Sequence, residues 1–282
     1  MIVEAAAADD ARLRERMRAM TFVRANGGVI HFADEGPRAA QPIVFINSLG
    51  TDFRIWDEVA QPLAQDARLI RYDKRGHGLS ELRTGGARIA DFAADLAALL
   101  DFLDVRAAMI VGLSIGGMIA QELYRLRPDL VSSLVLCDTA HRIGTLEFWA
   151  ARIGAVEAGG LEAIADGVMQ RWFSQNFHAN RRDELAGWRA MMTRTPQSGY
   201  LAACGALRDA DLTEAAKLIR APTLCVVGDE DGSTPPELVR ELSRLVPGAK
   251  FEIIAGAGHI PCVEKPDVLR GLIEAHRREV SP

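Results

Sequence analysis

A serine with a glycine two positions before it and another two positions after it closes an apolar run. The string Gly112-Leu-Ser114-Ile-Gly116 follows the apolar residues 107–111, and an amphipathic stretch continues it. A serine on a tight turn between a strand and a helix needs glycine at both places, because the backbone passes itself too closely there for a Cβ. The pattern predicts that Ser114 is a nucleophile. A turn without chemistry has the same pattern, so the prediction depends on a base and an acid further along the chain.

The predicted base is His259. Residues 250–255 have the apolar character of a strand, and Gly256-Ala-Gly-His259 closes it. Of the six histidines in the chain, His259 is the one that follows the carboxyl end of a strand behind a glycine-rich loop. A histidine that only packs the loop is the alternative interpretation.

The acid has three candidates. Residues 223–228 form a predicted buried strand, and the acidic turn Asp229-Glu-Asp231 lies between this strand and a helix that begins with proline. We prefer Asp231, because it lies beyond the strand end, where its carboxylate can reach the imidazole. Asp229 lies on the same turn. Asp138 follows the earlier strand 134–137, from which some proteins with this chain order take the acid; a capping or turn aspartate is its alternative role.

Two backbone N–H groups are predicted to form the oxyanion hole. Residues 42–46 form another buried strand, and Asn47-Ser-Leu-Gly50 follows it. Enzymes that use a nucleophile on a strand-to-helix turn take one donor from this loop and one from the residue after the nucleophile. The predicted donors are therefore the N–H groups of Leu49 and Ile115.

These residues belong to a chain of alternating strands and helices. A hairpin over 21–25 and 29–33 is followed by predicted strands near 42–47, 67–72, 107–113, 131–138, 222–228 and 250–255, with helices near 53–64, 88–103, 115–126, 235–246 and 266–278. Alternation of this kind predicts an α/β fold with a mostly parallel eight-stranded sheet and helices on both faces. Residues 20–139 and 216–282 form the predicted core, and residues 1–19 form an N-terminal extension.

An inserted helical cap is predicted over residues 140–215. This span has no convincing strand and contains three of the four tryptophans, Trp149, Trp172 and Trp188. Such a cap would cover Ser114. The alternative is an ordinary run of helices whose aromatic side chains are core residues, and for Trp188 the two interpretations are equally supported.

Composition excludes several classes of function. The net charge is −5 and no basic run suggests a nucleic-acid surface. No apolar run approaches the roughly 18 residues of a membrane span, and the first twenty residues lack the apolar region of a secretory signal. We therefore expect a cytoplasmic enzyme that binds a small molecule. No metal is expected, because the cysteines lack paired metal spacing; they are Cys137, Cys204, Cys225 and Cys262. Cys137 and Cys225 lie in predicted core strands, where a buried free thiol is the ordinary interpretation.

Several strings of the chain resemble 3-oxoadipate enol-lactonases, which belong to the α/β-hydrolase superfamily. They are Asn47-Ser-Leu-Gly-Thr-Asp52, Arg71-Tyr-Asp-Lys-Arg-Gly-His-Gly78, Gly112-Leu-Ser-Ile-Gly-Gly-Met118, Leu136-Cys-Asp-Thr-Ala140 with Arg142-Ile-Gly144, Arg171-Trp-Phe173, and Gly199-Tyr200 with Arg208-Asp-Ala-Asp-Leu212. The resemblance runs from about residue 21 to the end. The first three strings are common to many α/β hydrolases, whereas the strings in the cap are more specific. Two features depart from the family, namely Pro261-Cys262 after the histidine and the N-terminal extension.

The resemblance implies hydrolysis of 3-oxoadipate enol-lactone to 3-oxoadipate in bacterial aromatic catabolism, without a cofactor. Such a lactone carries a free carboxylate, which needs a cation in an apolar pocket. Arg142 is our first choice for that cation, with Trp149 as a wall of the pocket. The other candidates are Arg152, Arg171 and Arg208.

Three other functions stay open. They are a carbon–carbon bond hydrolase of ring-cleavage products, a general carboxylesterase or perhydrolase, and an inactive hydrolase fold used as a receptor or scaffold. The last is disfavoured because the chain keeps Ser114, Asp231 and His259. A dehalogenase or epoxide hydrolase is disfavoured because these enzymes resemble this fold with aspartate at the position of Ser114.

Overall fold

The computed structural model describes residues 20–280 with the exception of residues 84 and 86. The predicted extension over residues 1–19 therefore lies outside the described residues. None of the helices in the described part is long and apolar enough to cross a membrane. The four cysteines are buried and free, which confirms the prediction for Cys137 and Cys225.

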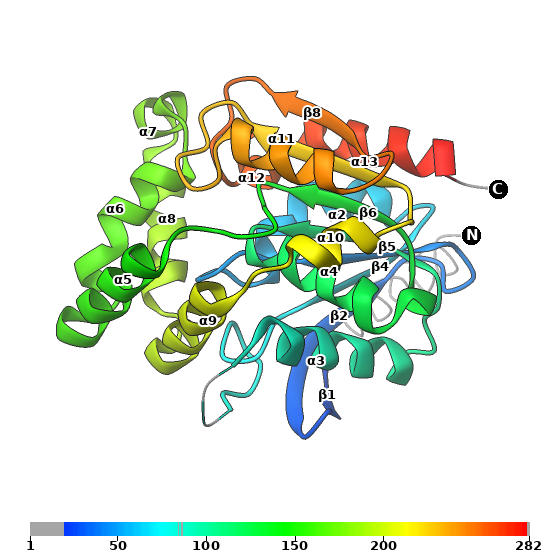
Figure 1. The fold of residues 1–282 in the computed structure, drawn as a ribbon, viewed down its shortest axis with the longest axis horizontal. Coiled ribbons are helices and arrows are strands. Elements are labelled where there is room, and N and C mark those ends of the chain that lie inside the picture. The colour runs from blue at the N-terminus through cyan, green and yellow to red at the C-terminus, as the bar shows by residue number, and fades with distance from the viewer. Residues whose placement is uncertain (1–19, 84, 86, 281–282) are drawn as a thin grey trace, which may run out of the picture.

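One eight-stranded sheet forms the centre of the molecule, which confirms the predicted fold class (Figure 1). The strands are β1 (Met20–Ala25), β2 (Gly28–Glu35), β3 (Pro42–Ile46), β4 (Arg68–Tyr72), β5 (Ala108–Leu113), β6 (Val131–Cys137), β7 (Thr223–Gly228) and β8 (Lys250–Ile254). Their order is β1-β2-β4-β3-β5-β6-β7-β8. The pairs β1–β2 and β2–β4 are antiparallel and the other pairs are parallel. The carboxyl ends of the parallel strands thus meet at one edge, where their loops can build a site.

Helices cover both faces of this sheet. On one face α3 (Ile89–Phe102), α4 (Ile115–Leu126), α10 (Thr213–Leu218) and α11 (Pro236–Leu245) follow one another in contact. On the other face α2 (Asp57–Leu63) contacts α12 (Pro261–Glu264) and α13 (Pro266–Val280). Strands β4, β5 and β7 are buried along their whole length, because helices remove both of their faces from water. The predicted helix over 53–64 begins as a 3₁₀ helix, η1 (Phe53–Trp56), and a second one, η2 (Pro128–Leu130), precedes β6.

The span between β6 and β7 is helical, and the described residues 140–215 contain no strand. It forms α5 (Leu146–Gly159), α6 (Glu162–Trp172), α7 (Gln175–Asn180), α8 (Arg182–Thr193) and α9 (Gln197–Asp209) before α10. Figure 1 shows α5 to α9 as a group beside the sheet, whereas α10 lies with the core helices α4 and α11. The helices that stand apart from the core therefore end with α9.

Candidate active site

Ser114 occupies a strained turn between β5 and α4. Its backbone has φ 58° and ψ −120°, a conformation that L residues rarely adopt. A Cβ on Gly112 would lie 2.4 Å from the Gly116 carbonyl oxygen, and a Cβ on Gly116 would lie 2.3 Å from that of Ile46. The serine side chain is thereby held at the carboxyl edge of the sheet, and 7% of Ser114 is exposed. Strain at a serine on such a turn is typical of a nucleophile.

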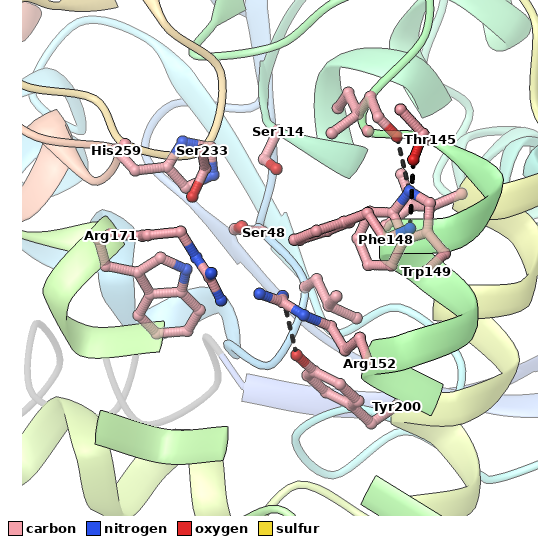
Figure 2. Close-up of a pocket in the computed structure, with 16 residues that line it drawn as sticks. Ser48, Ser114, Thr145, Phe148, Trp149, Arg152, Arg171, Tyr200, Ser233 and His259 are labelled. Atoms are coloured by element: carbon pink, nitrogen blue, oxygen red, sulfur yellow. Dashed lines mark hydrogen bonds between the residues drawn. The ribbon is translucent and has the colours of Figure 1, made fainter. Parts of the chain in front are cut away.

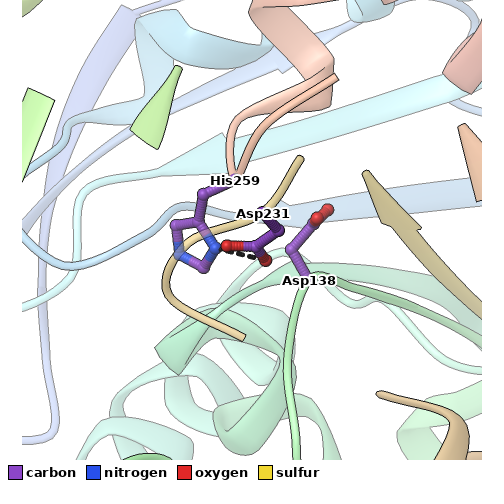
Figure 3. A group of neighbouring side chains, drawn as sticks. All are labelled: Asp138, Asp231 and His259. Carbon is purple, nitrogen blue, oxygen red and sulfur yellow. Dashed lines mark hydrogen bonds and ion pairs between the residues drawn. The ribbon is translucent and has the colours of Figure 1, made fainter. Parts of the chain in front are cut away.

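His259 lies at the end of the loop that follows β8, and only 2% of it is exposed. Its backbone N–H donates to the carbonyl oxygen of Trp172 at 2.8 Å, which connects the loop to the helical insertion. Its Nδ1 atom lies 2.9 Å from Oδ2 of Asp231 (Figure 3). With Nδ1 bonded to a carboxylate, the other ring nitrogen is left to take a proton from a nucleophile.

Asp231 is held as an anion by several donors. Its Oδ1 accepts from the N–H groups of Ser233 and Thr234, at 2.7 and 3.1 Å, and its Oδ2 accepts from the Thr234 hydroxyl at 2.6 Å. Burial opposes the charge, but His259 and these hydrogen bonds outweigh it and hold the pKa of Asp231 below its usual value.

The other two aspartates have different surroundings. Asp229 turns away from the imidazole and accepts hydrogen bonds from the backbone of Gly256 and Ala257. Asp138 is fully buried behind Asp231, and its Oδ1 accepts from the Gly228 N–H at 2.9 Å. Burial, and then the charge of Asp231, raise the pKa of Asp138 well above its usual value. Of the pair, Asp138 is therefore the carboxyl that more readily keeps a proton, and Asp231 is the one that more readily carries the charge.

Asp138, Asp231 and His259 also have the spacing of a metal-binding cluster, with donor atoms within 4.8 Å of one another (Figure 3). However, the imidazole Nδ1 and an Asp231 oxygen already bond each other, and Asp231 is saturated by backbone and hydroxyl donors. The arrangement fits proton transfer at the remaining imidazole nitrogen better than metal coordination.

The two predicted oxyanion donors are the N–H groups of Leu49, which precedes Ser114 in the chain, and of Ile115, which directly follows it. Leu49 lines the cavity together with Ser114, and no acceptor among the described residues bonds its N–H. Ile115 is the first residue of α4, where an N–H has no carbonyl one turn earlier in the helix. Both groups are available to an oxygen bound at Ser114.

A cavity of about 270 Å³ opens above Ser114 and His259 (Figure 2). Most of its wall comes from the helical insertion. The apolar lining residues are Leu49, Ile143, Phe148, Trp149, Trp172 and Leu207, and the polar ones include Ser48, Thr145, Arg152, Arg171, Tyr200 and Ser233. This size lies near the lower end of ligand pockets, at roughly 300–1,000 Å³, so the site suits a small substrate.

Two arginines point into this cavity. Figure 2 shows the guanidinium groups of Arg152 and Arg171 facing each other below Ser114 and His259. Arg152 lies 4.8 Å from the centre of the Phe148 ring and contacts the Tyr200 hydroxyl at 3.4 Å. Burial, and then Arg152, lower the pKa of Arg171. No carboxylate of the described residues forms an ion pair with either arginine, so the cavity holds positive charge without a protein counterion.

Arg142, the first choice for a substrate cation, lies elsewhere. Its side chain is 61% exposed and pairs with Asp211 at 2.6 Å, and it does not line the cavity. Arg208 is likewise paired, with Asp209 at 2.7 Å. Arg142 lies close to Asp138 in the chain, but its side chain is exposed, whereas Ile143, Gly144 and Thr145 directly after it line the cavity. Among the candidate arginines, Arg152 and Arg171 are the two that line the cavity.

The aromatic residues of the insertion divide into two groups. Trp149 is buried, donates from Nε1 to the Ile143 carbonyl at 2.6 Å and lines the cavity at Ser114, as does Trp172. Trp188 instead packs against the hydrophobic core and lines a separate groove between α8 and η1. Phe148 and Tyr200 were missed as lining residues. Tyr200 belongs to a string that resembles the enol-lactonases, whereas no signal in the sequence distinguished Phe148.

Comparison with known proteins places the chain among characterised relatives. A family model described as the alpha/beta hydrolase fold matches residues 41–266. The chain is 34% identical to 3-oxoadipate enol-lactonase 1 of Acinetobacter baylyi, over 82% of this chain and 86% of that protein.

Solved structures agree with this relationship. An enol-lactonase from Burkholderia xenovorans LB400 superimposes with a TM-score of 0.89 at 33% identity, covering 92% of this chain and all of that one. A thermophilic esterase from Thermogutta terrifontis, solved with malate bound, has a TM-score of 0.87 at 27% identity, covering 93% of this chain and 99% of that one.

Proposed function

Because the chain belongs to the α/β-hydrolase family, we propose that it is a serine hydrolase that opens 3-oxoadipate enol-lactone to 3-oxoadipate. Its catalytic residues are Ser114, His259 and Asp231, and its oxyanion donors are the N–H groups of Leu49 and Ile115. The proposed setting is aromatic catabolism in the cytoplasm. Support comes from the contact between His259 and Asp231, from the strained turn at Ser114 and from the enol-lactonases among the relatives.

The reaction proceeds through an acyl-serine. The Ser114 hydroxyl oxygen attacks the lactone carbonyl carbon while His259 takes its proton, and Asp231 stabilises the resulting imidazolium. The ring C–O bond then breaks, and His259 returns the proton to the departing enolate oxygen. The enol stays attached through the acyl group on Ser114 and tautomerises to a ketone. Water, deprotonated by His259, then attacks the acyl carbon. The bond between this carbon and Ser114 Oγ breaks, His259 returns the proton to Oγ, and the product leaves with its second carboxylate.

The observation that carries the choice of substrate is the pair of arginines without a protein counterion. Arg152 and Arg171 face each other in a small cavity whose other walls are mostly apolar. Two guanidinium groups that face each other in a mostly apolar cavity repel each other, so an anion bound between them is stabilised. Guanidinium groups also bind carboxylates with strong charge-assisted hydrogen bonds. A neutral ester has no group for this place, whereas the enol-lactone carries a carboxylate on the side chain of its ring. The esterase solved with malate bound is a relative whose ligand is also a small carboxylate.

The test compares a charged substrate with a neutral one in arginine variants. We expect Arg171→Met and Arg152→Met each to lower kcat/KM for the enol-lactone roughly 10- to 150-fold, the effect of about 1.5–3 kcal/mol from a lost charge-assisted contact. Hydrolysis of p-nitrophenyl acetate should change less than about twofold. Arg142→Met is the matched control and should change neither substrate, because Arg142 lies outside the cavity.

Three results would contradict the proposal. Equal losses on both substrates in the Arg152 and Arg171 variants would assign these arginines to the fold rather than to the carboxylate. Faster turnover of neutral esters than of the lactone by the wild-type enzyme would indicate a general esterase. Activity on a vinylogous 1,5-diketone acid in place of the lactone would indicate a carbon–carbon bond hydrolase.

A further inference from the structure

The loop that carries Leu49 is closed by its own hydrogen bonds. The Thr51 hydroxyl donates to the Ser48 carbonyl at 2.9 Å, and the Asn47 side-chain amide donates to the Thr51 carbonyl. Gly50 completes the turn with φ 73°. These contacts hold the loop together, but they do not attach it to the rest of the sheet.

Lys74 supplies that attachment from the segment after β4, the neighbour of β3 in the sheet. Only 1% of the residue is exposed. Its Nζ atom donates to the Ser48 carbonyl at 2.5 Å and lies 3.5 Å from the carbonyl oxygens of Asn47 and Thr51. An ammonium has three N–H donors. The three carbonyl oxygens within reach of the Lys74 Nζ atom all belong to this one loop.

Burial of a lysine amine at this position is unfavourable unless its hydrogen bonds to the loop compensate for the lost hydration. No carboxylate among the described residues lies within ion-pair distance of its Nζ atom. Burial lowers the pKa of Lys74 to about 7, while the more distant charges of Asp73 and Asp52 oppose this shift. The other titratable neighbour is His77, which is buried and whose pKa is itself well below its usual value. A methionine would fill a similar volume without the desolvation of an amine.

The contact with Ser48 determines where an oxyanion donor points. The carbonyl of Ser48 and the N–H of Leu49 belong to the same peptide group, which is planar and trans, so the two bonds point in opposite directions. A carbonyl held against Lys74 therefore directs the Leu49 N–H away from Lys74. Leu49 and Ser114 line the same cavity, and Lys74 does not line it. While Lys74 is protonated, its charge at the carbonyl end also polarises the peptide group and strengthens its N–H as a donor.

We propose that Lys74 is a positioning residue of the oxyanion hole, which holds the Ser48 carbonyl so that the Leu49 N–H faces the oxygen that becomes charged at Ser114. The inference rests on the proposed serine-hydrolase mechanism and does not depend on which ester or lactone is the substrate. Lys74 contacts no substrate and acts through the loop.

The experiment compares Lys74→Met with wild type on p-nitrophenyl acetate and measures inhibition by phenylboronic acid, which forms a tetrahedral adduct with a serine nucleophile. Loss of a whole oxyanion donor typically lowers kcat by about 10²–10³-fold, so a misdirected donor should lower it roughly 10- to 100-fold. KM should change less than about threefold, because the donor acts mainly on the transition state. Inhibition by the boronic acid should weaken by about the same factor as kcat.

Controls separate this role from a structural one. Lys217→Met removes an exposed lysine that pairs with Glu214 and should leave both measurements unchanged. Lys74→Gln keeps an N–H donor on a side chain one bond shorter, and it should recover part of the lost kcat and of the boronic acid affinity. It also keeps the inference testable if Lys74→Met does not fold.

Three results would overturn the inference: wild-type kcat in the folded Lys74→Met protein, a lower kcat with unchanged affinity for the boronic acid, or Lys74→Gln no better than Lys74→Met. In each of these the wild-type enzyme still hydrolyses the ester, so the proposed function stands. A wild-type protein without serine-dependent ester hydrolysis would instead overturn the proposed function and this inference together.

Discussion

The carboxylate of Glu264 accepts a hydrogen bond from the backbone N–H of Gly258 at 2.6 Å, directly before His259 in the chain. The same carboxylate accepts from the hydroxyl of Ser174 at 2.6 Å and from its N–H. Glu264 on α12 therefore joins the loop of His259 to the helical insertion.

The first prediction concerns this connection. Glu264→Ala leaves buried donors without an acceptor and should lower the free energy of unfolding by about 1–3 kcal/mol. It should also lower kcat more than it raises KM, because the position of His259 is disturbed. Urea unfolding and steady-state kinetics measure the two effects.

Two variants serve as controls for Glu264. Glu264→Gln keeps one acceptor oxygen, so its free energy of unfolding and its kcat should fall less than those of Glu264→Ala. Glu279→Ala removes an exposed partner of Lys250 and should change neither. Equal, small effects of Glu264→Ala and Glu279→Ala would contradict the role given to Glu264.

The second prediction concerns the nucleophile. Ser114→Ala and His259→Ala should each lower kcat roughly 10⁴- to 10⁶-fold with the fold intact, because the two groups act as one unit. A fluorophosphonate should label the wild-type protein once and should not label Ser114→Ala, as measured by intact mass. Labelling at another serine, or activity retained in either variant, would refute the acyl-serine mechanism.

The third prediction distinguishes the three aspartates. Asp231→Asn should lower kcat about 10³- to 10⁴-fold, because the imidazole loses the carboxylate that fixes its tautomer. Asp138→Asn should cost less than about tenfold, since burial raises the pKa of this carboxyl and favours its neutral form, and an amide has the same shape. Asp229→Asn should cost little. A larger loss from Asp138→Asn than from Asp231→Asn would show that the two roles are exchanged.

The fourth prediction concerns pH and follows from Lys74. Its pKa falls from 10.5 in the unfolded chain to about 7 in the folded protein. Between these values the unfolded chain binds more protons, so the contribution of Lys74 to stability rises with pH and is lost again as the pH falls toward 7. Relative to Lys74→Met, the wild-type free energy of unfolding should increase between about pH 7 and pH 9, by at most about 1.4 kcal/mol per pH unit. Parallel curves for the two proteins in urea unfolding would show that the pKa of Lys74 does not shift.

The sequence by itself determined the features that depend on short stretches of chain. The strand-to-helix turn at Ser114 could be predicted because glycines 112 and 116 are local requirements of that turn. His259 could be predicted because a histidine behind a glycine loop at a strand end is a local pattern as well. The positions of the strands followed from apolar runs between turns, and the order of strands and helices along the chain was enough to predict the class of sheet.

Only the tertiary structure decided which charged groups meet. Asp138 and Asp231 follow neighbouring strands and both approach the imidazole, so burial and the number of donors around each carboxyl separate the charged acid from the neutral one. Arg152 shares a face of α5 with Trp149, whereas Arg171 reaches the cavity from α6. Whether the two guanidinium groups come close depends on how α5 and α6 pack. The spacing of the two residues along the chain does not reveal this packing. The attachment of the Leu49 loop by Lys74 likewise joins segments from two paired strands, and no local pattern distinguishes a buried lysine there from an exposed one.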